Sequence, residues 1–120
     1  MTVVLVVEDN PVNRDVIGRR ASRRGFSVFF AEDGPEGVLA AATQRPDIIL
    51  MDINLGDMDG YEATRLILAD PRSAAIPVIA VTANAFETDR QQALAAGCVD
   101  FDTKPINFER LIGNCLPGRR

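Results

Sequence analysis

The chain has 120 residues, of which 47% are hydrophobic and 25% are charged, a balance typical of one globular domain that spans residues 1–120. Its net charge of −4 argues against a general affinity for nucleic acid, which requires an excess of phosphate-neutralising Lys and Arg. The chain contains no histidine, which excludes Ser-His-Asp hydrolysis, Cys-His catalysis and most zinc sites.

Five apolar runs, most of them rich in β-branched residues, predict five buried β-strands. They cover residues 3–7, 27–31, 47–52, 78–81 and 99–103. Apolar spacing and capping residues predict a helix after each strand. The first helix starts at Asn10-Pro11 and ends before Gly25, and its apolar residues recur near helical spacing: Val12, Val16, Ile17 and Ala21. The second helix starts at Asp33 and ends before Pro46. The others cover residues 60–69, 84–96 and 107–116, with Asp59, Asn84 and Asn107 as their expected caps. No apolar run approaches the roughly 18 residues that a membrane-spanning helix needs, so we expect a cytoplasmic protein without a membrane partner.

The strict alternation of strand and helix implies a parallel sheet with helices on both faces, joined by right-handed crossovers. We therefore expect an α/β fold in three layers, with five helices around a five-stranded sheet of the flavodoxin-like order 2-1-3-4-5. Under this order the strands 3–7 and 47–52 are neighbours at the point where the winding reverses. A ligand crevice then lies beyond the carboxyl ends of these two strands.

Polar residues end or directly follow four of the expected strands: Asp52 ends one, and Glu8-Asp9, Thr82 and Lys104 follow the others. Parallel strands end at one edge of the sheet, so these groups gather there. Three close carboxylates repel one another, and oxygen ligands without His or Cys favour Mg²⁺ as the ion that relieves the repulsion. Because an Asp carboxylate can act as a nucleophile toward phosphoryl groups, the pattern predicts a phosphoryl-transfer site. Taken singly, each residue also fits an ordinary polar turn.

Several short motifs, in this order and at this spacing, resemble the receiver domain of bacterial response regulators in two-component signalling. The matching residues are Glu8-Asp9, Leu50-Met51-Asp52, Met58-Asp59-Gly60, Val81-Thr82-Ala83, Ala96-Gly97 and Lys104-Pro105. The motifs are spread along essentially the whole chain. In general form the chain also resembles stand-alone receivers of the DivK kind, which regulate a kinase by binding it.

The resemblance implies that Asp52 accepts a phosphoryl group from a histidine kinase or a histidine phosphotransfer protein. It implies that Asp9 is a direct Mg²⁺ ligand, that Glu8 is a ligand through water, and that the backbone carbonyl of Asn54 coordinates the ion beside Asp52. Such a protein is a phosphate-accepting switch rather than an enzyme, with at most slow loss of its own phosphate.

The resemblance also implies how the phosphoryl group is bound and sensed. Thr82 and Lys104 bind the group, and Phe101 changes rotamer together with Thr82. The output is a protein-binding surface made of the helix at 84–96, the strand at 99–103 and the helix at 107–116. A downstream protein binds there, and no nucleic acid is involved.

Two alternatives stay open at this stage. The chain could be a receiver domain of a hybrid histidine kinase rather than a free-standing regulator. It could instead be a phosphohydrolase with an Asp nucleophile, but such an enzyme needs a second carboxylate two residues after the nucleophile, where this chain has Asn54.

Two further features have ordinary and functional interpretations. The pairs Arg19-Arg20 and Arg23-Arg24 in the first helix fit a solvated basic face or a docking patch for an acidic partner. The two cysteines, Cys98 and Cys115, fit small buried hydrophobic residues better than a redox pair.

Overall fold

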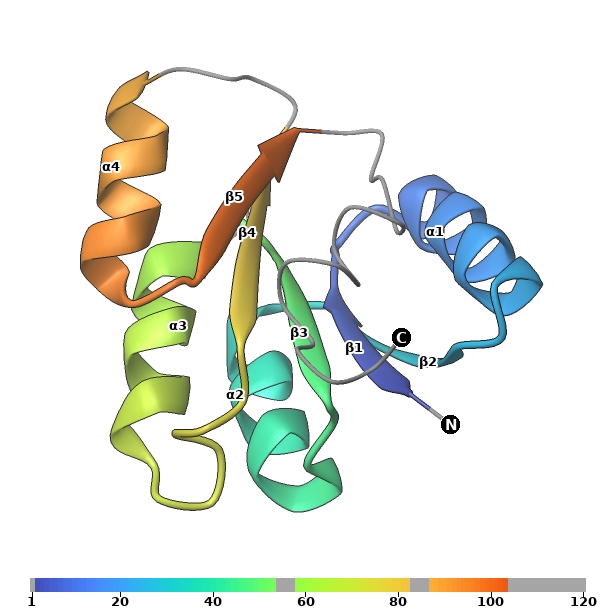
Figure 1. The fold of residues 1–120 in the computed structure, drawn as a ribbon, viewed down its shortest axis with the longest axis horizontal. Coiled ribbons are helices and arrows are strands. Elements are labelled where there is room, and N and C mark those ends of the chain that lie inside the picture. The colour runs from blue at the N-terminus through green and yellow to red at the C-terminus, as the bar shows by residue number, and fades with distance from the viewer. Residues whose placement is uncertain (1, 54–57, 83–86, 104–120) are drawn as a thin grey trace.

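The computed structural model describes residues 2–53, 58–82 and 87–103, in which five strands alternate with four helices (Figure 1). In chain order these are β1 (Val3–Val7), α1 (Pro11–Arg23), β2 (Ser27–Ala31), α2 (Gly34–Gln44), β3 (Ile48–Asp52), α3 (Gly60–Ala69), β4 (Val78–Thr82), α4 (Glu87–Ala96) and β5 (Asp100–Thr103). The helix expected at residues 107–116 and the expected cap Asn84 lie outside the described residues.

The five strands form one parallel sheet in the order β2-β1-β3-β4-β5, which confirms the expected topology. In the register, Val7 lies opposite Met51 and Asp52 lies opposite Val81. The central strands β1, β3 and β4 therefore end at one level, and the polar residues that follow them share that edge of the sheet.

The core has two layers because successive side chains of each strand point to opposite faces of the sheet. On one face, Ile17 and Ala21 of α1 pack with Val6 and Leu50 of the central strands. On the other face, residues of α2, α3 and α4 pack against the remaining strand positions: Ala41, Ala63, Ile67 and Ala93 against Leu5, Val7, Ile49, Met51 and Ala80. Figure 1 shows α1 on the opposite side of the sheet from α2, α3 and α4.

Short polar side chains start three of the helices, as the sequence predicts. The Asn10 side chain accepts hydrogen bonds from the N–H groups of Val12 and Asn13, and Pro11 occupies the first helical position. Asp33 and Asp59 cap α2 and α3 by accepting from the N–H groups three residues later, at 2.8 Å in both cases. None of the described helices is long and apolar enough to cross a bilayer.

The structure corrects the sequence prediction at several positions. β3 begins at Ile48 rather than Asp47, because the Asp47 carboxylate accepts a hydrogen bond from the Val3 N–H at 2.7 Å. Strand β4 continues to Thr82, and β5 begins at Asp100. Of the four apolar residues spaced along the first helix, Ile17 and Ala21 are buried against the sheet as expected, whereas Val12 and Val16 are 69% and 43% exposed.

Candidate metal and phosphoryl site

Three carboxylates meet at the carboxyl edge of the sheet. One oxygen each from Glu8, Asp9 and Asp52 can be chosen so that all three lie within 4.8 Å of one another. The Glu8 and Asp52 side chains are buried, at 2% and 6% exposure, whereas Asp9 is exposed. Val7 of β1 lies opposite Met51 of the adjacent strand β3, so the next residues, Glu8 and Asp52, lie beside each other at the sheet edge. The structure thus brings together the three acids that the sequence predicted to share a site.

A small hollow of about 10 Å³ lies beside the two buried acids. Glu8 and Asp52 line it together with Ile17 of α1 and Val81 of β4. A space of this size is near the lower limit for one water molecule. Two carboxylates held this far from bulk water need nearby positive charge or hydrogen-bond donors to be stable in the ionised form.

The loop between β1 and α1 orients Glu8 through both its carboxylate and its backbone. The Asn10 N–H donates to Glu8 Oε2 at 3.3 Å, and Arg14 Nη1 donates to the Glu8 carbonyl oxygen at 2.8 Å. The amino terminus of α1, which carries partial positive charge, follows the acids directly at Pro11. Sequence reasoning missed Arg14, although an arginine one turn into a helix that follows an acidic strand end is a usable signal.

Gly60, the first residue of α3, lies against the backbone that carries Asp52. A Cβ at Gly60 would be 2.6 Å from the Asp52 carbonyl oxygen and 2.7 Å from the Ile53 Cα, closer than real Cβ atoms approach. The Gly60 N–H donates to the Ile53 carbonyl at 3.3 Å. Gly60 therefore permits α3 to brace the end of β3. The sequence signal for this role, which was missed, is a glycine in the first turn of a helix, where most other residues would stabilise the helix more.

The predicted switch residues lie on neighbouring strands. Thr82 ends β4 and is 1% exposed, and Phe101 of β5 is 6% exposed and lies opposite Ala80 in the register. Alternation places Thr82 on the sheet face of Ala80, which packs in the same core cluster as Phe101. Lys104 and Asn54, the other predicted site residues, lie outside the described residues.

The donor set fits magnesium. It consists of carboxylate oxygens only, which suit a hard divalent cation, and it leaves positions for water and for phosphoryl oxygens.

Cys98 lies apart from these acids, in the core cluster beneath α3 and α4. The Thr64 hydroxyl lies 3.7 Å from its sulfur. Burial raises the pKa of the Cys98 thiol, and its placement confirms the prediction that Cys98 is a buried small residue. Cys115 lies outside the described residues.

Comparisons with known proteins agree with this geometry. Residues 4–115 match the response regulator receiver domain. PilH of Pseudomonas aeruginosa is 37% identical over 112 residues, which are 93% of this chain and 93% of PilH. DivK of Brucella anthropi is 37% identical over 109 residues, which are 91% of this chain and 89% of DivK.

Among solved structures, the receiver domain of the sensor histidine kinase PA1611 from Pseudomonas aeruginosa superposes with a TM-score of 0.86 at 41% identity. The match covers 95% of this chain and 96% of that domain, which has a magnesium ion coordinated in its active site cleft. The family match spans most of the chain, and the sheet order and the acid cluster are consistent with it. This chain belongs to the receiver-domain family of two-component response regulators.

Proposed function

We propose that this receiver domain accepts a phosphoryl group on Asp52 from a histidine kinase or a histidine phosphotransfer protein. The observation that carries the proposal is the cluster of Glu8, Asp9 and Asp52 at the carboxyl edge of the sheet. Of the three, Asp52 is the acid that ends the central strand β3, and Gly60 braces the backbone at that point.

Four residues would hold the Mg²⁺ ion. Asp9 and Asp52 offer carboxylate oxygens, Glu8 acts through water, and Asn54 offers its backbone carbonyl. When bound, the ion supplies positive charge that offsets the negative charge on the phosphoryl oxygens. The ion in the PA1611 receiver domain supports this assignment.

The transfer step requires an ionised Asp52. One carboxylate oxygen of Asp52 attacks phosphorus, and the bond between phosphorus and the donor's histidine nitrogen breaks. The electron pair stays on that nitrogen. Lys104 and the Thr82 hydroxyl bind phosphoryl oxygens in this proposal and stabilise the charge that spreads over them.

The phosphorylated state should be lost only slowly, so the domain acts as a switch and not as a turnover enzyme. Rapid hydrolysis needs a general base beside the attacking water, and the residue two positions after Asp52 is Asn54, which cannot serve as one. The burial of Asp52 also limits access of water to the acyl phosphate.

Phosphorylation would be read through the surface formed by α4, β5 and the helix predicted at residues 107–116. In this proposal Thr82 moves toward the phosphoryl group, and Phe101 changes rotamer with it. Leu94 on α4 and Val99 before β5 are 45% and 55% exposed, which gives this surface apolar side chains for a downstream protein.

Two kinds of receiver remain candidates within the family. PilH and DivK are matched over 93% and 89% of their own lengths, which supports a stand-alone regulator that occupies residues 1–120. The likeness to PA1611 supports the alternative of a receiver within a hybrid histidine kinase. The cytoplasmic location stays a prediction.

Incubation with Mg²⁺ and a small acyl phosphate tests the site. We expect one added phosphoryl group by intact mass, none in Asp52→Asn, and normal labelling in Asp70→Asn, which makes the same chemical change at the end of α3. Continuous phosphate release would instead indicate a phosphohydrolase, and labelling of Asp52→Asn would refute the assignment of the acceptor.

The switch role of Thr82 needs a separate measurement. Amide exchange in α4, compared with and without a phosphoryl mimic, should change in the wild type and in Thr82→Ser, which keeps the hydroxyl. The change should be much smaller in Thr82→Ala. An equal response in all three proteins would remove Thr82 from the switch.

A further inference from the structure

A groove of about 560 Å³ lies between α1 and the strand β2. Its strand side is formed by Val28 and Phe30, and its helix side by residues of α1: Arg14, Asp15, Gly18, Arg19, Ser22 and Arg23. Phe30 is 36% exposed, and its ring packs beneath Gly18, where a Cβ would lie 3.0 Å from the ring carbon Cζ. The groove thus combines an aromatic floor with an arginine-rich wall.

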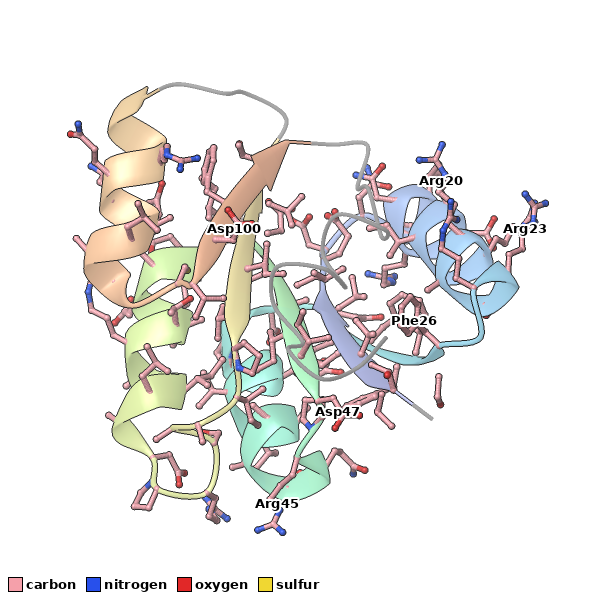
Figure 2. All side chains as sticks on the ribbon, in the orientation of Figure 1. Arg20, Arg23, Phe26, Arg45, Asp47 and Asp100 are labelled. Carbon is pink, nitrogen blue, oxygen red and sulfur yellow. The ribbon has the colours of Figure 1, made fainter. Side chains whose placement is uncertain are left out.

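The charge of this region is opposite to that of the rest of the chain. Residues 11–24 contain five arginines and one aspartate, a net charge of +4 in a chain whose net charge is −4, so the remainder carries −8. Figure 2 shows Arg20 and Arg23 projecting from α1 away from the sheet. The Arg19 side chain pairs with Asp15 at 3.1 Å, and Arg14 pairs with Glu32 at 3.6 Å, where the Glu32 side chain is 71% exposed. A partner's carboxylate could replace Glu32 at Arg14.

The strand side of the groove is an open edge of the sheet. β2 is the terminal strand, and no other described strand pairs with its outer side. The Ser27 N–H donates to the Thr2 carbonyl, and the Ala31 carbonyl accepts from the Glu8 N–H, so alternate residues of β2 bond to β1. The intervening residues, Val28 and Phe30, therefore direct their backbone N–H and C=O groups outward. The same two residues line the groove with their side chains.

We propose that the α1–β2 groove binds an extended acidic segment of a partner protein, which adds to the edge of β2 as a further strand. Its backbone bonds to Val28 and Phe30, an apolar side chain covers the Phe30 ring, and its carboxylates meet Arg19 and Arg23. The groove thereby gives the domain a second binding surface, distinct from the proposed output surface of α4, β5 and the helix predicted at residues 107–116.

Two other occupants fit the charges less well. Nucleic acid would extend past the groove toward the exposed acids Glu32, Asp33 and Glu36 on a chain of negative net charge, which repels a polyanion. A second copy paired through β2 would bring two arginine-rich α1 helices near one another, because such an interface uses the same patch on both copies.

Binding can be measured by fluorescence anisotropy with a labelled peptide of Glu-Thr-Val-Thr repeats, whose glutamates and valines lie on one face of an extended strand. We expect saturable binding that weakens as salt rises, and at least tenfold weaker binding by Arg19→Glu/Arg23→Glu, about 1.4 kcal/mol or more. The control Arg72→Glu, at the end of α3, should bind as the wild type does. A peptide with lysine in place of glutamate should not bind.

Amide exchange separates strand addition from simple charge attraction. In the complex, the Val28 and Phe30 amides should become protected, and a proline-containing version of the peptide should lose this protection. The proposal is overturned if the glutamate peptide does not bind, if Arg19→Glu/Arg23→Glu binds it equally well, or if these amides exchange unchanged. Tighter binding of single-stranded DNA at the groove, or a dimer by light scattering that β2 substitutions dissolve, would also overturn it.

Discussion

The Asp52→Asn substitution should raise the melting temperature of the metal-free protein and reduce the stabilisation by Mg²⁺. Two unit charges 4.8 Å apart repel by about 3.5 kcal/mol at an effective dielectric constant of 20, and by about 0.9 kcal/mol in water. We take about 1 kcal/mol as a lower estimate, because Asp9 is exposed. With about 2.1 cal/mol/K of unfolding entropy per residue, a chain of 120 residues melts about 4 °C higher for each kcal/mol.

The stabilisation by Mg²⁺ can be calculated on the basis that the ion binds only the native state. At ten times Kd, Mg²⁺ should stabilise the wild type by about 1.4 kcal/mol, or about 6 °C. If loss of the Asp52 charge weakens Mg²⁺ binding about tenfold, the increment at the same concentration falls to about 0.4 kcal/mol, or about 2 °C.

Thermal melts of the wild type, Asp52→Asn and the control Asp70→Asn, each with EDTA and with Mg²⁺, test this reasoning. Asp70→Asn should keep the wild-type magnesium increment, because Asp70 lies at the end of α3 and pairs with Arg72. If the wild type and Asp52→Asn melt at the same temperature under both conditions, the three acids do not share a metal site.

Gly60→Ala should lower the free energy of unfolding by about 1 to 3 kcal/mol, because its Cβ meets backbone atoms, and should slow labelling by an acyl phosphate. The control is Gly97→Ala, where alanine would be strained at φ +109 and the residue lies before the amino end of β5. This variant should lose stability but accept phosphate at the normal rate per folded molecule. Equal slowing in both variants would show that Gly60 does not position Asp52. Arg14→Ala should weaken Mg²⁺ binding about tenfold, because the Glu8 carbonyl loses its hydrogen bond from Arg14. An unchanged Kd for Mg²⁺ in titration calorimetry would refute this. The Cys98 thiol has an ordinary pKa of 9.0 that burial raises in the folded state, so the unfolded chain ionises first and stability should fall as pH rises above 9.0. Urea melts at about pH 8 and about pH 10 should show that the free energy of unfolding falls less in Cys98→Ala than in the wild type. An identical fall in both proteins would show that Cys98 ionisation does not cause it.

Much of the fold could be predicted from local signals in the sequence. Apolar strand runs, the caps Asn10 and Asp59, and the strict alternation of strand and helix together predicted the sheet order, which the structure confirms. The acid cluster could be predicted as well, because Glu8 directly follows one central parallel strand and Asp52 ends its neighbour, and topology alone brings such ends together.

Other features depended on how distant segments meet. The periodicity of α1 did not show that Ile17 rather than Val16 faces the sheet, because that depends on the rotation of the helix against the strands. The roles of Arg14 and Gly60 rest on single contacts with the ends of β1 and β3.

The α1–β2 groove was likewise decided by the tertiary structure. The sequence showed the arginines of the first helix, but it did not show that they stand beside an open sheet edge and an exposed Phe30. Propensity and capping act between residues a few positions apart and are therefore written in the local sequence. A groove or a brace, in contrast, exists only where segments distant in sequence are packed to within a few ångströms, and that distance is set by the packing of the whole core.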